Sequence, residues 1–304
     1  MLKKKAIVTL ADSKYFELLN ELINSILNFK QSSEIKICVL DAGLTDNQKK
    51  EISKKIYSIK KADWDISVPF YKVMKKDWLK SQVSRAFLPS YFPEFDSYLW
   101  IDCDAWINDW ECINLYFKAC ENGKLAITQS IGPGYRDIAK VKWLFGKFAE
   151  IKTQNYKHAR SSNISQDTSR KIALAPHLNI GVFALKKDSK CWDVWQKNLK
   201  ETLSSGQIFG SEGLAINISV YKDNIPTEFL PLNCNWIASH LLPKFDNSKK
   251  KFVEPNLPNH VIGILHLAGG IWENGLDMRL NKNIKVKINT LSGETIDRSL
   301  RYLE

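Results

Sequence analysis

The sequence lacks a hydrophobic run long enough to cross a bilayer. Its longest stretch without a charged residue, 255–272, contains three glycines and several Asn, Pro and His residues, whereas a membrane-spanning helix needs about twenty consecutive apolar residues. At the N-terminus, the apolar run 6–10 follows Lys3-Lys4-Lys5 but stops at Asp12, too early for the apolar core of a signal peptide. We therefore expect this run to be a core strand and the protein to be cytoplasmic.

Paired cysteine motifs are also missing. The six Cys residues show no Cys-x-x-Cys spacing and no pairing with His, which argues against a zinc site. Most of them lie in apolar surroundings, which indicates reduced, buried thiols of the kind found in cytosolic proteins. The sequence also lacks internal repeats and a linker. We therefore expect one compact domain with long insertions.

Acidic residues are in deficit, with 33 Asp and Glu against 44 Lys and Arg and a net charge of +11. A surplus of this kind is compatible with nucleic acid, an anionic membrane, an anionic substrate or a merely lysine-rich surface. The sequence has no RNP-like run, helix-turn-helix signature or zinc finger, so we expect no nucleic-acid partner. The surplus is local: residues 136–171 carry nine Lys or Arg against three Asp or Glu, a net of +6, and residues 244–251 carry four Lys against one Asp, a net of +3.

Strand-like and helical patterns alternate over the first hundred residues. Short apolar runs predict strands at 5–10, 35–40, 66–70 and 98–101, and helical periodicity predicts helices at 16–27, 48–59 and 81–91. Further along we expect a basic helix at 136–151, a polar segment at 152–170, strands at 180–185 and 262–267, a Trp-rich helix near Trp192 and Trp195 and a buried element at 214–221. This order predicts an α/β fold with a single Rossmann-like, mostly parallel sheet, helices on both faces and a smaller antiparallel or looped C-terminal extension.

Two carboxylates follow directly after the predicted strand 98–101. On an extended chain Asp102 and Asp104 share a face, while Cys103 between them points the other way. Two like charges side by side repel each other unless a cation lies between them, and carboxylate oxygens favour Mg²⁺ or Mn²⁺. We interpret the pair as part of a metal site. The alternative is two loop aspartates that cap the next helix or face solvent.

Together with its surroundings this acidic pair resembles that of the GT-A nucleotide-sugar glycosyltransferases, and especially of their family 8, a retaining group. The stretches that carry the resemblance follow in the family's order, from about residue 5 to 272. They are Ala11-Asp12-Ser13-Lys14-Tyr15, Leu40-Asp41-Ala42-Gly43-Leu44-Thr45, Ser84-Arg85-Ala86-Phe87-Leu88-Pro89, His177-Leu178-Asn179-Ile180-Gly181-Val182-Phe183 and Ile264-Leu265-His266-Leu267-Ala268-Gly269.

The resemblance implies a metal-dependent transfer of a hexose from a nucleotide sugar, UDP-linked, to a glycan or glycolipid, with retention of configuration. It implies that Mn²⁺ or Mg²⁺ is held by Asp102, Asp104 and His266. The nucleotide sugar would be bound by Ala11, Asp12, Tyr15, Arg85, Asp102, Asp104 and Gly269. Asp12 and Tyr15 would hold the base, and Arg85 would face the phosphates.

Glu212 and Asn179 are the candidates for the catalytic work at the sugar, where a carboxylate or an amide can stabilise an oxocarbenium-like transition state. A front-face attack and a double displacement through Glu212 both remain open. For other positions the ordinary structural roles also stay open: a helix N-cap for Asp12, a core aromatic for Tyr15, a surface salt bridge for Arg85 and a buried core residue for His266.

Two positions depart from the family pattern. Trp272 stands where the family has a Lys that contacts the diphosphate, and Gly213, after Glu212, stands where it has a Gln. An inverting GT-A glycosyltransferase and a non-catalytic protein that binds nucleotide sugars or glycans are therefore the alternative functions.

We expect residues 1–272 to form the GT-A domain and residues 273–304 a basic extension packed on it. Within the domain, 132–171 would be an insertion on the acceptor side, with Trp143 and Tyr156 available to stack on sugar rings. The local excess of positive charge favours an acidic acceptor, such as a phosphorylated glycolipid, or peripheral docking at the anionic inner face of a membrane.

Overall fold

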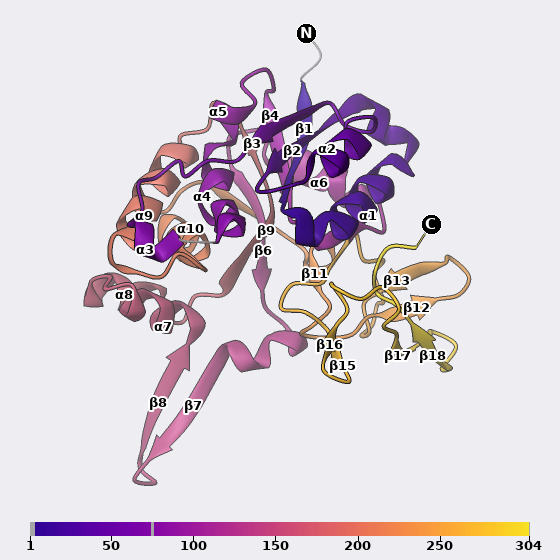
Figure 1. Cartoon of the computed structure of the whole chain (residues 1–304). Helices are drawn as coiled ribbons and strands as arrows, with labels where there is room; N and C mark the ends of the chain where they lie inside the picture. Colours follow the sequence, from indigo (N-terminus) through magenta and orange to yellow (C-terminus); the bar gives the residue numbers. More distant parts are fainter. Residues whose placement is uncertain (1–3, 74–75, 304) are drawn as a thin grey trace.

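The computed structural model describes residues 4–73 and 76–303, and a seven-stranded sheet forms the body of the molecule (Figure 1). All neighbouring strands run parallel except β9, which is antiparallel to both of its neighbours, β4 and β6. The α/β fold with a mainly parallel sheet is therefore confirmed. In spatial order the strands are β10 (Thr227–Leu230), β6 (Leu125–Ser130), β9 (His177–Lys186), β4 (Ser97–Ile101), β1 (Lys5–Ala11), β2 (Ile35–Asp41) and β3 (Ser58–Lys61).

Helices cover both faces of this sheet because its central strands are buried on both sides. Along β1, Ala6, Val8 and Leu10 point into one core cluster, and Ile7 and Ala11 point into the other. The first cluster is completed by α9 (Cys191–Ser205) and α10 (Ser211–Tyr221), and the second by α1 (Phe16–Leu27) and α6 (Glu111–Ala119). All six cysteines are free thiols; five are buried, and Cys103 is half-buried.

The region between β2 and β4 differs from its prediction. The helix expected at 48–59 is α2 (Asp46–Ile52), which begins at a Thr45–Gln48 capping box and ends early because β3 (Ser58–Lys61) follows. No strand forms at 66–70: β3 is the edge strand instead, paired only with β2. The helix expected at 81–91 is interrupted at 85–87. The α-helices that follow in this region are short: α3 (Phe70–Val73), α4 (Ser81–Ser84) and α5 (Leu88–Tyr91).

The helix predicted for 136–151 is wrong. Most of this stretch is an antiparallel hairpin of β7 (Ala139–Leu144) and β8 (Phe148–Thr153), which projects away from the body (Figure 1). Lysines alternate with apolar residues at 140–143, which is the period of a strand. The chain reverses through Phe145 and Gly146, both of which have positive φ. The polar segment that follows forms α7 (Gln154–Ser161) and α8 (Gln166–Ile172).

The last third of the chain packs beside the main sheet. The strand expected at 262–267 is β14 (Ile264–His266), which lies not in the main sheet but between β11 (Trp236–Ile237) and β5 (Ala105–Ile107). Three hairpins complete the region: β12 (Lys244–Asp246) with β13 (Lys251–Val253), β15 (Trp272–Glu273) with β16 (Leu276–Asp277), and β17 (Val286–Asn289) with β18 (Thr295–Arg298). Among the described helices, none is both long and apolar enough to cross a bilayer.

Candidate active site

Asp102 and Asp104 lie at the carboxyl end of β4, where the chain turns sharply into β5. The Asp102 N–H donates to the carbonyl of Gly181 on β9 at 2.8 Å, and the Ala105 N–H donates to the Asp102 carbonyl at 3.0 Å. Strand β5 pairs with β14 in a register that sets Ala105 opposite His266. This pairing brings an imidazole 162 residues distant in sequence to within 3.2 Å of the Asp104 carboxylate.

The three predicted metal ligands therefore form one group. One ligand atom each from Asp102, Asp104 and His266 lies within 4.8 Å of the others. Burial raises the pKa of Asp102 despite the neighbouring Arg85. At Asp104 burial acts in the same direction, but His266 and Arg279 outweigh it and lower the pKa. Two carboxylates and one imidazole are a donor set that suits Mn²⁺ or Mg²⁺.

The orientation of His266 fits a ligand role. Asn235 accepts a hydrogen bond from His266 Nδ1 at 2.9 Å, and its amide nitrogen donates to Asn179 Oδ1 at 3.1 Å. With the proton on Nδ1, the Nε2 lone pair points toward Asp104. Burial favours the neutral imidazole, but the neighbouring Asp104 carboxylate outweighs it and raises the pKa of His266.

Gly181 on β9 leaves room for this group. A Cβ at this position would lie 2.3 Å from His266 Cε1, 2.8 Å from Asp102 Oδ2 and 2.9 Å from Asn179 Oδ1. Any side chain at this position would collide with His266 and Asp102, so only glycine lets the β9 backbone pass this close to them. The cluster of donor atoms and the missing Cβ both fit a bound metal ion.

Arg85 is buried behind the acidic pair. Its Nη2 lies 3.2 Å from Asp102 Oδ1 and its Nη1 lies 4.0 Å from Glu212 Oε1, while its guanidinium stacks on Trp100 at 4.8 Å. The surface salt bridge considered for Arg85 is therefore wrong, because only 3% of the residue is exposed. The Trp100 indole N–H also donates to Asp102, at 2.7 Å.

Glu212 is buried at the start of α10. Burial raises the pKa of its carboxyl to about 7 even though Arg85 acts in the opposite direction. The second carboxyl oxygen, Oε2, is buried and has no hydrogen-bond partner among the described residues. Glu212 thus touches the site through Arg85 and does not line the adjoining cavity.

That cavity has a volume of about 350 Å³ and opens beside the acidic pair. Ala11, Asp12 and Tyr15 form part of its wall, at the end of β1. Asp12 caps the short 3₁₀ turn 13–15 by accepting from Lys14 N and Tyr15 N, so it has the capping role that the sequence left open. The other lining residues are Leu10, Lys14, Trp78, Ser81, Gln82, Arg85, Trp100, Asp102, Cys103 and Asp104.

Like Glu212 and His266, the sequence-predicted residues Asn179 and Gly269 do not line the cavity. Asn179 is half-buried and accepts hydrogen bonds from Gly181 N and Asn235 Nδ2, so it orders the ligands from behind. Gly269 has a φ of +79° and follows His266 closely, but it lies outside the lining residues. Trp272, at the position of the family's Lys, is largely exposed.

Arg279 is a cation that sequence reasoning missed. Its Nη1 lies 3.6 Å from Asp104 Oδ2, its guanidinium lies 5.9 Å from the centre of the Tyr15 ring, and it binds the Asp277 carboxylate through Nε and Nη2. It stands seven positions after Trp272 in a looped region, where no pattern marks it. Asn235 was missed for the same reason.

We expect Arg279→Gln to weaken binding of the nucleotide-sugar donor that the sequence resemblance implies by roughly tenfold, since a charge-assisted contact near the acidic pair is lost. Steady-state kinetics should show a raised KM for the donor, with partial recovery in Arg279→Lys. The same KM in all three proteins would exclude Arg279 from the donor site.

A mainly parallel α/β sheet with an Asp-x-Asp pair and a distant His at its carboxyl edge defines a protein of the GT-A fold. Residues 6–126 match the family model described as Glycosyl transferase family 8. This segment of the chain is therefore similar to that family. No curated protein sequence matches the chain closely enough to count as a relative.

Solved structures agree on the fold. The apo structure of WbbM, a bifunctional glycosyltransferase, is 15% identical with a TM-score of 0.57, and the match covers 92% of this chain and 49% of that one. The galactosyltransferase LgtC, in complex with donor and acceptor sugar analogues, is 15% identical with a TM-score of 0.51, and the match covers 87% of both chains. The chain thus spans about half the length of WbbM and most of LgtC.

Proposed function

We propose that this chain transfers a hexose from a nucleotide sugar, UDP-linked, to a glycan or glycolipid acceptor with retention of configuration, in a reaction that depends on Mn²⁺ or Mg²⁺. One observation carries the proposal: Asp102, Asp104 and His266 form a ligand group at the edge of a 350 Å³ cavity. A bound divalent cation supplies positive charge for the diphosphate that leaves.

The chain's own residues would bind and orient the donor. Tyr15 offers a ring for the base. Asp12 lies on the same wall of the cavity, and because both capping bonds go to its Oδ1, its Oδ2 is the oxygen it would offer to the base. Arg85 and Arg279 flank the acidic pair from two sides. Arg279 would then supply the positive charge that the family's Lys provides and that Trp272 cannot.

The burial of Glu212 bears on the route of the reaction. A nucleophile in a double displacement must reach the anomeric carbon, but Glu212 is 5% exposed and lies behind Arg85. We propose that Glu212 and Asn179 are positioning residues for Arg85 and for the metal ligands. This arrangement favours the front-face route, in which the leaving phosphate accepts the proton.

The experiment that tests this function is a panel of nucleotide sugars with Mn²⁺, first in thermal unfolding and then in turnover. A donor that binds the folded state raises the melting temperature, and EDTA should abolish both the shift and the turnover. Proton NMR of the product then reads the anomeric configuration. An inverted product would favour the inverting alternative, and donor binding without turnover would favour the binding-protein alternative.

The β7–β8 hairpin supports a role for this insertion in acceptor binding at an anionic lipid surface. Val141 lies opposite Ile151 and Trp143 opposite Ala149, so the hairpin has an apolar face. Phe145 at its tip is 95% exposed, and Lys140, Lys142 and Lys147 lie alongside. An aromatic tip with flanking lysines suits a membrane interface with anionic headgroups.

We expect the double variant Trp143→Ser with Phe145→Ser to bind anionic vesicles at least about tenfold more weakly than the wild type, since two interfacial rings are lost. Hydrolysis of the soluble donor should not change, and Tyr71→Ser, which also removes an exposed ring, should bind vesicles normally. Vesicle sedimentation at low salt is the measurement. Unaltered binding by the double variant would leave the hairpin without a membrane role.

A further inference from the structure

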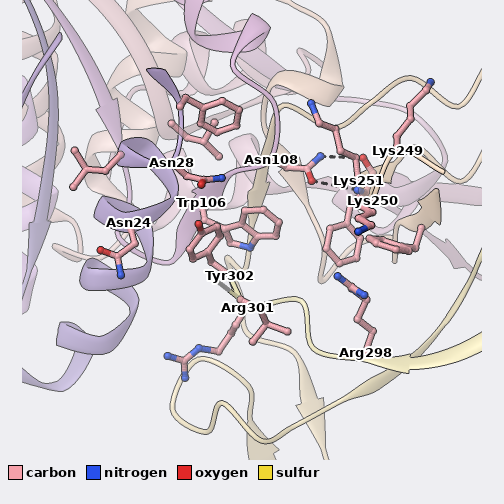
Figure 2. A pocket seen from close by; sticks show the side chains of 16 residues that line it. Asn24, Asn28, Trp106, Asn108, Lys249, Lys250, Lys251, Arg298, Arg301 and Tyr302 are labelled. Carbon is pink, nitrogen blue, oxygen red and sulfur yellow. Dashed lines mark hydrogen bonds between the residues drawn. The ribbon is translucent and has the colours of Figure 1, made fainter. Parts of the chain in front are cut away.

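A second pocket, of about 560 Å³, lies between α1, the β12–β13 hairpin and the C-terminal residues 298–303 (Figure 2). It shares no lining residue with the cavity beside the acidic pair. Trp106 and Asn108, on and just after β5, form its inner part. The donor chemistry proposed above does not use this pocket.

The pocket is lined by five cationic side chains: Lys249, Lys250, Lys251, Arg298 and Arg301. Three of them have carboxylate partners. Lys251 lies 2.9 Å from Asp109, Lys249 lies 3.8 Å from Asp246, and Arg301 binds Glu17 and Glu21. For Lys250 and Arg298, no ion pair forms with any described residue, so the pocket holds positive charge without a counter-charge.

Arg298 is held in place by aromatic rings and not by an acid. Its guanidinium carbon lies 3.9 Å from the centre of the Phe245 ring and 5.5 Å from that of Phe252. Its Nε is buried and has no hydrogen-bond partner among the described residues, and burial lowers the pKa of the guanidinium. Figure 2 shows Arg298 extending from β18 toward the hairpin that carries the three lysines. A guanidinium held on two rings, with no described carboxylate beside it, keeps its terminal N–H groups for an oxyanion.

Lys250 is held in an unfavourable backbone conformation. It has a φ of +54° at the end of the hairpin loop, a region in which Gly or Asn costs less than Lys by about 1 kcal/mol. The hairpin is also anchored: the Asn108 side chain donates to the carbonyls of Phe252 and Ile262 and accepts from Phe252 N. A lysine kept at such a position, on an anchored loop beside an unpaired arginine, points to a ligand with negative charge.

We propose that this pocket is a second binding site, specific for a phosphate monoester group. Cations from the β12–β13 hairpin and from β18 line it, and a phosphate monoester, with about two negative charges over three acceptor oxygens, can bind more than one of them. The rings of Trp106 and Tyr302, whose centres lie 5.6 Å apart, line the pocket beside them and would pack against the uncharged part of the ligand. The site needs neither the nucleotide sugar nor the metal, so it stands independently of the proposed function.

The test compares four proteins in EDTA at constant ionic strength: the wild type, Arg298→Gln, Lys250→Gly and the control Lys54→Gln. Lys250→Gly removes the charge and relieves the strained backbone, so it does not threaten the fold. Lys54 is exposed and does not line the pocket. Binding of inorganic phosphate is followed by titration calorimetry and by the rise in melting temperature.

We expect phosphate to bind the wild type and Lys54→Gln equally, and to bind the two pocket variants roughly tenfold more weakly. Equal binding by all four proteins, or no binding by the wild type, would overturn the site. A second arm uses vesicles containing phosphatidic acid. If the vesicles capture the wild-type protein, if added phosphate reverses this capture, and if Arg298→Gln is not captured, the phosphate group belongs to a lipid headgroup. Binding of phosphate without capture identifies a soluble phosphate ester.

Discussion

Gly181→Ala is expected to weaken Mn²⁺ binding by roughly a hundredfold or more, and metal-dependent turnover with it, because the new methyl group would displace two ligands. The Cβ would lie 2.3 Å from His266 Cε1 and 2.8 Å from Asp102 Oδ2, distances at which the imidazole and the carboxylate must both move. Overpacking of this kind also lowers stability, by about 1–3 kcal/mol. Mn²⁺ affinity, read from the electron paramagnetic resonance signal of free Mn²⁺, separates the loss of the site from the loss of the fold.

Gly213→Ala is the matched control. A Cβ at Gly213 meets no atom within 4 Å, and replacing Gly by Ala inside a helix stabilises it by about 1 kcal/mol. This variant should melt no lower than the wild type and bind Mn²⁺ with the same affinity. If Gly181→Ala also bound Mn²⁺ normally, the group of Asp102, Asp104 and His266 would not be the metal site.

Glu212→Gln is expected to change the pH dependence of stability and to lower kcat by roughly a hundredfold. The folded pKa of Glu212, about 7, lies above its ordinary value of 4.5, so the folded state binds this proton more tightly than the unfolded state. Stability therefore decreases as the pH rises from about 4.5 to 7 and stays at the lower level above that. Burial raises the pKa of the Glu212 carboxyl most, Arg85 lowers it, and the negative charge of Asp102 raises it further.

Gln mimics the protonated carboxyl, so the variant should resemble the wild type at pH 5. At pH 8.5 it should be more stable, by an amount of the order of 3 kcal/mol. Urea unfolding in EDTA at both pH values measures this difference. Glu228→Gln removes a carboxylate that pairs with Lys124 and is 46% exposed, and its stability should shift little at either pH. Parallel pH profiles for the wild type and Glu212→Gln would refute the prediction.

The kinetics of Glu212→Gln distinguish front-face attack from a double displacement. As a positioning residue, Glu212 acts through Arg85, so Glu212→Gln should raise the donor KM as well as lower kcat. A nucleophile would instead form a glycosyl-enzyme intermediate on Glu212, which mass spectrometry of the wild type with a slow donor would detect. The absence of that adduct during turnover is the result we expect.

The sheet and the acidic pair could be predicted from the sequence because they rest on local patterns. An apolar run followed by Asp102 and Asp104 marks both the strand and its carboxyl end. His266 was assigned by resemblance, since nothing near it in sequence reveals that β14 pairs with β5. Arg279 and Asn235 could not be found in either way, because tertiary packing alone brings them to the site.

The errors in secondary structure have the same origin. At 48–59 the helical periodicity continued past Ile52, but the edge of the sheet offered β2 as a partner, and residues 58–61 paired with it instead. At 136–151 the positive charge suggested a basic helix, while the alternation of Lys with Val141 and Trp143 was the better indicator. At 48–59, therefore, strand pairing overrode the local helical period, whereas at 136–151 the composition misled and the period of two was correct.

Strand β5 is synthesised long before β14, the strand with which it pairs. A growing chain that has passed Asp104 has both carboxylates but neither His266, which is 162 residues further on, nor Arg279. The group of Asp102, Asp104 and His266 is therefore complete only when the last third of the chain has packed beside the main sheet.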